Sequence, residues 1–279
     1  MLEIYLVRAL FGTLVLTYDV FNKGYASKVE DTCLNNLGSD INRDTSGCSQ
    51  LDKTRLSACD GPASMTSSLA LVPYDESKVL PHEKSVREFA LGGHVFTIKQ
   101  DWHTLGVAAV VWDSAVVLAE YLIQNRNLIQ GKNVLELGAG TGLTGMVAAS
   151  LGACVTVTER AEAMEHLRST IEHNTAGKSW EISAKELDWR TYPSEDGNFP
   201  EQDVIIGADI IYIEETFEDL LRTISSLAKT ERIHILLSCK IRYDRDLRFL
   251  SLLRENFGVT EVLFDEKRDI KVFSVLRSS

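Results

Sequence analysis

The sequence predicts an α/β fold in which a mostly parallel sheet is covered by helices on both faces and ends in an antiparallel hairpin. Short apolar strands alternate with helical segments from residue 133 to residue 256, and such alternation is typical of a parallel sheet. Two further strands, 259–264 and 270–276, follow with no helix between them, so they must pair antiparallel. A separate N-terminal β-hairpin is predicted at 86–99, because Gly92-Gly93 suits the positive φ angles of a primed hairpin turn.

The remaining elements follow from the period of the apolar residues. The strands predicted before the terminal hairpin are 133–137, 154–158, 180–185, 203–207 and 233–238. The predicted helices are 107–122, 144–151, 161–173, 217–228 and 245–256. In the third helix, Leu167 and Ile171 lie four residues apart and mark the face expected to be buried.

Residues 1–64 are predicted to lie outside the folded domain, which we expect to span 65–279. Segment 22–64 is rich in Ser, Asp, Asn, Thr and Gly and cannot bury enough apolar surface to offset its ordering entropy. Residues 9–16 form an apolar run that is too short to cross a bilayer and lacks a clear cleavage site. We therefore expect a disordered extension, with a targeting segment or a mispredicted start as alternatives.

Composition limits the classes of partner. Of the 279 residues, 44% are hydrophobic and 25% are charged, which is ordinary for a globular protein. The net charge of −11 argues against a partner bound through phosphates, so no nucleic acid is expected. The five cysteines show no C-x-x-C spacing and the six histidines no metal-ligand spacing. We expect no metal, no membrane and a reducing, cytoplasmic location.

The most specific motif is Glu136-Leu137-Gly138-Ala139-Gly140-Thr141-Gly142, at the end of the strand 133–137. Glycines let a ligand approach the backbone, and ligands bind at the carboxyl ends of strands in open α/β sheets. Gly140, Gly142 and Gly145 also match the dinucleotide pattern G-x-G-x-x-G. Glu136 favours a different ligand, because an acid would repel a pyrophosphate but not an amino-acid ligand with a cationic ammonium and sulfonium. A dinucleotide site and a structural loop stay as alternatives.

Glu159 and Trp189, at or just after the ends of the next two strands, have side chains suited to binding a nucleoside. Glu159 ends the second strand of the sheet, where an acid can accept hydrogen bonds from both ribose hydroxyls. Trp189 follows the third strand, where an aromatic ring would suit an adenine. A helix-capping or solvated acid and a tryptophan that fills the core are the alternatives.

Asp209 and Tyr212 follow the strand 203–207 and are separated by two residues, so both could point into one site from a tight turn. The alternative is an N-cap aspartate and a packed tyrosine. The next strand is followed by residues that could form the rim of a substrate site or a solvated basic cluster: Cys239, Lys240, Arg242 and Tyr243.

Together these segments resemble the seven-β-strand protein-lysine methyltransferases, most closely the type that acts on Hsp70 chaperones. The matching segments are 70–74, 100–102, 105–113, 136–143, 207–212 and 241–243. The Asp-x-x-Tyr element and Val110-Val111-Trp112-Asp113 are specific to this group, whereas the glycine loop is shared by many methyltransferases. The resemblance covers the part of the chain expected to fold and implies a Rossmann-like, seven-stranded methyltransferase sheet.

The resemblance also implies S-adenosyl-L-methionine as cofactor and a lysine of a protein, of the Hsp70 type, as substrate. The implied cofactor contacts are Trp112, Gly138, Ala139, Gly140, Glu159, Trp189 and Ala208, to which the charge argument adds Glu136. Asp209 and Tyr212 would shape the lysine site, Asp209 by orienting the amine and Tyr212 by accepting its nitrogen. A cytoplasmic monomer is expected.

Other readings of the same residues remain open. An NAD-dependent oxidoreductase would account for the glycines and Glu159 but not for the terminal hairpin. A non-catalytic binding module on the same fold would bind the cofactor without transferring a methyl group. Within the enzyme class, the substrate could instead be an AAA-type ATPase or an elongation factor.

Overall fold

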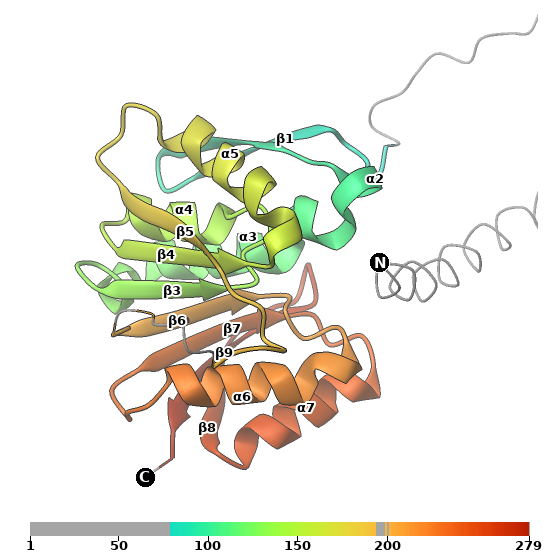
Figure 1. Cartoon of the computed structure of the whole chain (residues 1–279), viewed down its shortest axis with the longest axis vertical. Helices are drawn as coiled ribbons and strands as arrows, with labels where there is room; N and C mark the ends of the chain where they lie inside the picture. The colour runs from blue at the N-terminus through green and yellow to red at the C-terminus, as the bar shows by residue number, and fades with distance from the viewer. Residues whose placement is uncertain (1–78, 194–198, 200, 279) are drawn as a thin grey trace, which may run out of the picture. The chain divides into compact units, whose positions relative to one another are not determined.

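The structure, a computed structural model, describes residues 79–193, 199 and 201–278 (Figure 1). The extension predicted at 1–64 and the predicted domain start near residue 65 lie outside the described residues.

Seven strands form one sheet in the order β5-β4-β3-β6-β7-β9-β8 (Figure 1). They are β3 (Asn133–Leu137), β4 (Cys154–Glu159), β5 (Glu181–Glu186), β6 (Val204–Ala208), β7 (His234–Cys239), β8 (Phe257–Asp265) and β9 (Ile270–Arg277). The first five pair parallel, whereas β9 pairs antiparallel with both β7 and β8. The predicted fold class, a parallel sheet closed by a C-terminal hairpin, is confirmed.

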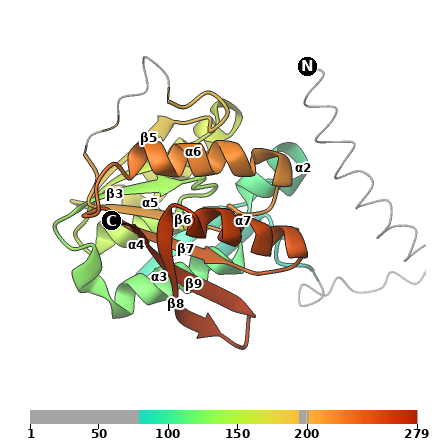
Figure 2. The same ribbon diagram turned by 90° about the horizontal axis from the view of Figure 1, so that it is seen from below.

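Helices cover both faces of this sheet (Figure 2). One face carries α3 (Asp113–Gln124), α4 (Leu143–Ser150) and α5 (Met164–Thr175), and the other carries α6 (Phe217–Leu227) and α7 (Asp244–Arg254). Shorter helical turns are α2 (Trp102–Leu105), η2 (Gly106–Ala109), η3 (Arg126–Leu128), η4 (Ala161–Ala163) and η5 (Glu214–Thr216). The predicted buried pair on α5, Leu167 and Ile171, is confirmed.

The N-terminal hairpin is formed by β1 (Val86–Leu91) and β2 (His94–Lys99), as predicted. Gly92 and Gly93 have φ angles of +59° and +82°, the left-handed values that a primed turn requires. The side-chain amide of Asn174, on α5, accepts from the N–H of Thr97 at 2.8 Å and donates to its carbonyl at 3.0 Å. One side chain thus pairs with β2 as a neighbouring strand would, and it attaches the hairpin to the helical layer.

The predicted helix 107–122 is wrong in its first part, because α3 begins only at Asp113. The backbone N–H and carbonyl of Val111, which would form hydrogen bonds within a helix, are instead bound by two side chains from earlier in the chain. Gln100 Oε1 accepts from the N–H of Val111 at 2.9 Å, and Arg87 Nη1 donates to its carbonyl at 2.8 Å. The residues just before α3 are therefore extended, and this local extension sets where Trp112 lies.

The stretch Trp102–Gln124 is long and apolar enough, by length and composition alone, to cross a membrane. In the structure it is divided into α2, η2 and α3. Val117, Leu118 and Leu122 of α3 are at most 1% exposed in the core between α3 and the sheet. Packing on the sheet accounts for this apolar composition.

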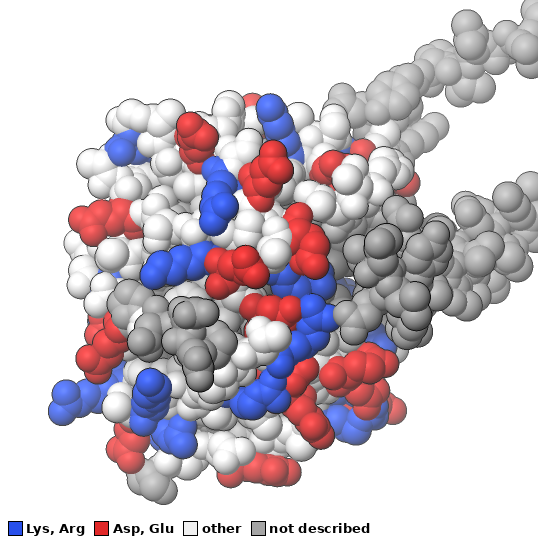
Figure 3. Space-filling model, viewed as in Figure 1, with Lys and Arg blue, Asp and Glu red and all other residues white. Residues whose placement is uncertain are grey.

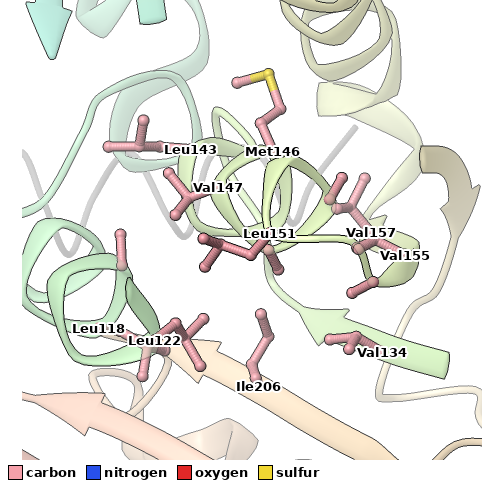
Figure 4. Close-up of a cluster of buried hydrophobic side chains, with 14 of the residues drawn as sticks. Leu118, Leu122, Val134, Leu143, Met146, Val147, Leu151, Val155, Val157 and Ile206 are labelled. Carbon is pink, nitrogen blue, oxygen red and sulfur yellow. The ribbon is translucent and has the colours of Figure 1, made fainter. Parts of the chain in front are cut away.

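Successive residues of the central strands face opposite layers, as the two-residue period of a strand requires. Val134 packs in the layer of α3, α4 and α5, whereas Leu135 packs in the layer of α6 and α7. Figure 4 shows Val134, Val155, Val157 and Ile206 of the sheet beside side chains of α3 and α4. The continuous apolar runs of β3, β6 and β7 are therefore explained by burial on both faces.

Helix α4 lies unusually close to the sheet at Gly145. A Cβ placed on this residue would be 2.3 Å from Cγ1 of Val157 and 2.5 Å from Oε2 of Glu136. Neither neighbour is a flexible chain end in open space, because Val157 is fully buried and Glu136 is 2% exposed. The third glycine of the G-x-G-x-x-G pattern therefore serves close packing of the helix on the strands.

We predict that Gly145→Ala destabilises the protein by up to about 2 kcal/mol, because overpacking a filled core costs about 1–3 kcal/mol and Ala in a helix recovers only roughly 1 kcal/mol of that cost. Gly258→Ala in β8 is the matched control, since its added Cβ would meet nothing closer than 3.8 Å. Thermal denaturation of both variants measures the difference. A Gly145→Ala protein that melts at or above the wild-type temperature would contradict the packing argument.

Candidate active site

The strand order brings the carboxyl ends of five parallel strands to one edge of the sheet. β4 and β5 lie on one side of β3, and β6 and β7 lie on the other. A reversal of this kind marks the position where open α/β sheets bind ligands. The glycine loop follows β3, Glu159 ends β4, Asp209 follows β6 and Arg242 follows β7.

The glycine loop has left-handed backbone at three positions. The φ angles of Gly138, Gly140 and Gly142 are +58°, +55° and +76°. A Cβ on Gly138 would lie 3.2 Å from Cζ2 of Trp189, and one on Gly140 would lie 3.2 Å from the carbonyl oxygen of Ala108. The loop is thus held in a conformation that favours glycine, with its backbone partly exposed, and Trp189 packs directly against it.

Trp112 and Ala208 are linked to the loop through their neighbours. The indole Nε1 of Trp112 donates to the carbonyl of Val107 at 3.0 Å, and Val107 adjoins Ala108, whose carbonyl oxygen would meet a Cβ on Gly140. Ala208 follows directly on Gly207, which pairs with Leu137 at the end of β3. Trp189 thus lies against the loop, whereas Trp112 and Ala208 are connected to it through adjacent residues, and their contacts with a cofactor stay predictions.

Glu159 fixes the loop from the neighbouring strand. Its Oε2 accepts from the N–H of Gly140 at 3.0 Å and its Oε1 from the N–H of Arg160 at 3.0 Å. Burial raises the pKa of Glu159, and these two N–H groups and the Arg160 charge partly oppose the rise. A carboxylate offers about four acceptor positions, so each oxygen keeps capacity for a further donor such as a ribose hydroxyl.

The side chain of Glu136, on β3, reaches the first turn of α4, which follows the glycine loop. Its Oε2 accepts from the N–H of Gly145 at 2.9 Å, which satisfies one of the donors that every helix leaves free at its N-terminus. Burial raises the pKa of Glu136 to about 8, and the charge of Glu159 adds to the rise. The structure thus assigns Glu136 a capping contact, and its contact with a cationic ligand stays a prediction.

Asp209 stands at the end of β6 with a left-handed φ of +55° and donates its backbone N–H to the carbonyl of Ser238 at 2.7 Å. Its carboxylate, 6% exposed, accepts two hydrogen bonds from the guanidinium of Arg242. Burial raises the pKa of Tyr212, and the negative charges of Glu159 and Asp209 raise it further. The residues predicted to catalyse and the residue predicted to bind ribose therefore lie in one electrostatic neighbourhood.

From the sequence, Arg242 was predicted only as a possible residue at the rim of a substrate site, and its pairing with Asp209 was not foreseen. The pairing with Asp209 joins residues 33 positions apart. The strand order could have predicted this pair, because β6 and β7 are parallel strands joined through a helix and their carboxyl ends are therefore expected to lie side by side. Among the described residues, no group of three or more His, Cys, Asp or Glu side chains could hold a metal ion.

Comparison with known proteins decides the family. Residues 91–256 match the model of the lysine methyltransferase family. The chain belongs to this family. It is 47% identical over 220 residues to protein N-lysine methyltransferase METTL21A of Danio rerio, covering 75% of this chain and 97% of that one. It is 44% identical to the Mus musculus protein of the same name, covering 74% and 95%.

A solved structure shares the fold of this lysine methyltransferase at low sequence identity. The 16S rRNA N2 G1207 methyltransferase RsmC of T. thermophilus, in complex with AdoMet and guanosine, has a TM-score of 0.50 and 18% identity, covering 69% of this chain and 50% of that one. The predicted methyltransferase fold is confirmed. Membership of the lysine methyltransferase family confirms the predicted methyltransferase activity with S-adenosylmethionine as cofactor, and the alternative of an NAD-dependent oxidoreductase falls.

The residues present fit this cofactor. The left-handed glycine loop leaves backbone accessible where a Cβ would clash, and Glu159 keeps free acceptor positions beside it. Glu159 would hold the ribose, Trp189 would contact the base, and Trp112, Gly138, Ala139, Gly140 and Ala208 would complete the contact. These roles remain predictions for the individual residues.

We predict that Glu159→Gln weakens binding of S-adenosylhomocysteine at least about tenfold, because an amide loses one charged acceptor and charge-assisted hydrogen bonds contribute roughly 1.5–3 kcal/mol. Glu162→Gln is the matched control, since Glu162 is exposed two residues beyond Arg160. Titration calorimetry measures both. Equal affinities of the two variants would remove Glu159 from the cofactor site.

We predict that Glu136→Gln raises thermal stability at alkaline pH in the absence of cofactor. The pKa of Glu136 is raised in the folded state, so the stability that its protonated form contributes is present at acidic pH and is lost as pH rises toward about 8. Gln keeps an acceptor for Gly145 without the buried charge. Melting temperatures should agree near pH ~5 and diverge by several degrees near pH ~9; a gap that is constant with pH would contradict the titration.

Proposed function

We propose that this enzyme transfers methyl groups from S-adenosylmethionine to a lysine of an Hsp70-type chaperone, as a cytoplasmic monomer. The observation that carries the proposal is the buried carboxylate of Asp209, which follows β6 directly and is held by Arg242, with Tyr212 three residues further along the chain. Because β6 pairs with β3, after which the glycine loop begins, the proposed acceptor residues and the proposed cofactor residues share one edge of the sheet.

The chemical difficulty is that the acceptor lysine must be neutral. With an ordinary lysine pKa of about 10.4, only about one side chain in a thousand is neutral near pH ~7.4, a cost of roughly 4 kcal/mol. When bound, S-adenosylmethionine supplies a methyl group on a positively charged sulfur, which the lone pair of a neutral amine displaces. The protein contributes by excluding water, orienting the amine and favouring its neutral form.

Asp209 and Tyr212 have side chains suited to orienting the amine. The Asp209 carboxylate has acceptor positions beyond the two that Arg242 uses, and these can take N–H bonds from a lysine amine. The raised pKa of Tyr212 keeps its phenol neutral, so the hydroxyl can donate to or accept from the nitrogen, and its ring face can contact the methylated amine. Positioning of this kind is the main contribution a protein makes to an in-line displacement.

The surface and the cysteines support the proposed setting. Figure 3 shows acidic and basic side chains interspersed over the visible face, a distribution that suits a protein partner better than a nucleic acid. Within the described part of the chain, Cys154 and Cys239 are both free thiols, which suits a reducing compartment. The monomeric state is tested by light scattering of the purified protein.

We predict that the wild-type enzyme methylates purified Hsp70 on lysine and that Asp209→Ala lowers the rate on the order of 100-fold or more, because misplaced reacting groups cost about this much. Mass spectrometry of Hsp70 after incubation with enzyme and S-adenosylmethionine measures the product and its methylation state. Tyr212→Phe, which removes only the hydroxyl, should lose less. Glu165→Ala, an exposed change on α5, should leave the rate unaltered.

The same assay separates the alternatives. An elongation factor and an AAA-type ATPase are presented alongside Hsp70, and faster labelling of either one would replace the proposed substrate. Cofactor binding without transfer to any protein in a cytosolic extract would indicate a non-catalytic module. Full activity of Asp209→Ala would remove that residue from the lysine site.

A further inference from the structure

The Asp209 carboxylate is held by a two-point ion pair. Arg242 Nη1 lies 2.9 Å from Oδ1 and Nη2 lies 2.8 Å from Oδ2, so the planar guanidinium fixes the plane of the carboxylate as well as its place. The side chain of Asp209 is 6% exposed and that of Arg242 is 34% exposed. The acid is thus buried at the site, and its partner reaches it from the solvent side.

The backbone of Arg242 is held in turn by α7. The N–H of Arg242 donates to Oδ2 of Asp246 at 2.8 Å, and the N–H of Tyr243 donates to the same oxygen at 3.0 Å. Asp246 is itself only 2% exposed. The buried carboxylate of Asp246 therefore fixes the backbone of the segment after β7, and this places the guanidinium of Arg242 beside Asp209.

The charge of this pair matters for the reaction. An unpaired carboxylate close to a lysine favours the ammonium form, which has no lone pair and cannot accept a methyl group. A carboxylate whose charge is cancelled by a guanidinium can still accept a hydrogen bond from the amine but no longer favours its protonated form. Methyl transfer needs the second arrangement.

We infer that Arg242 is a positioning residue for methyl transfer, which fixes Asp209 and cancels its charge so that the arriving lysine is oriented without being held as an ammonium ion. The inference rests on the proposed role of Asp209 at the lysine site. It assigns to Arg242 control over the pH at which the acceptor becomes nucleophilic.

Three other titratable groups interact with the pair directly: Tyr212 beyond β6, Cys239 on β7 and Asp246 on α7. Further charges act on these groups, namely Glu159 and Arg160 on Tyr212 and Lys271 on Cys239. Burial, together with the charges of Asp209 and Asp246, raises the pKa of Cys239 to about 12. Burial likewise raises the pKa of Tyr212, so ionisation of both groups is displaced to more alkaline pH.

The test is the pH dependence of kcat for methylation of Hsp70, from pH ~6.5 to pH ~10, for the wild type, Arg242→Gln and Arg242→Lys. We expect the Arg242→Gln profile to shift upward by about one pH unit or more, the size of effect that one neighbouring charge produces. Its activity would then be about tenfold or more below wild type near pH ~7.5 and would recover toward pH ~10. Arg242→Lys keeps the charge and should keep the wild-type profile, with a lower plateau from the lost two-point geometry.

Two controls isolate the charge effect. Asp209→Asn leaves Arg242 as an unpaired cation, which disfavours the ammonium form. Adding Arg242→Gln to it removes that cation and should return the profile to the wild-type position, not above it as Arg242→Gln alone does. Arg248→Gln, on α7, breaks an exposed ion pair with Glu214 of η5 and should leave the profile unaltered. Melting temperatures are recorded throughout, because Arg242→Gln leaves a buried carboxylate unpaired, and the comparison of Arg242→Lys with wild type stands even if the Gln variant does not fold.

The outcomes separate this inference from the proposed function. If wild type methylates Hsp70 and Asp209→Ala does not, but Arg242→Gln keeps the wild-type profile or loses activity equally at every pH, the inference is wrong and the function stands. A shifted profile for Arg242→Lys would also overturn it. If the wild type transfers no methyl group to any protein, the proposed function fails and the inference fails with it.

Discussion

The missing side chain at Gly145 sets the distance between α4 and the sheet, and the geometry of the active site depends on that distance. Helix α4 begins directly after the glycine loop, so the position of its first turn fixes where the loop can run. Glu136 holds that turn from below through the N–H of Gly145, and Glu159 holds the loop from the side through the N–H of Gly140. Two acids on adjacent strands thus keep the backbone of the ligand site in place.

The ionised forms of the same two acids are electrostatically unfavourable without a positive charge beside them. Burial raises the pKa of both, in the case of Glu136 to about 8, which means that the protein alone penalises their charged forms. A positively charged ligand beside them favours ionisation, because an opposite charge stabilises the carboxylate. The guanidinium of Arg160 offers little in its place, since it lies 4.0 Å from Glu159 and is 46% exposed to screening solvent. A cationic methyl donor therefore meets an electrostatic need that a pyrophosphate would worsen.

Sequence patterns predicted the sheet, its terminal hairpin and the N-terminal hairpin because these depend on local periodicity and on turn residues. They failed where distant side chains override local preference. Val111 lies in an apolar run that looks helical, but Gln100 and Arg87 bind its backbone and extend it. The ion pair between Asp209 and Arg242 was missed for a related reason, because no local pattern shows which of several polar residues at neighbouring strand ends will pair.

The two halves of the site treat charge in opposite ways, and each treatment suits its reactant. Around the glycine loop the acids Glu136 and Glu159 outweigh the nearby cation, as a positively charged donor requires. At the end of β6 the charge of Asp209 is cancelled by Arg242, as an amine that must be neutral requires. Exchanging the two arrangements would defeat both steps, since an acid neutralised by an arginine at the loop would no longer stabilise a sulfonium, and an unpaired aspartate at the acceptor would retain the proton. A fold that places the ends of β3, β4, β6 and β7 side by side lets both conditions hold at adjacent strand ends within one site.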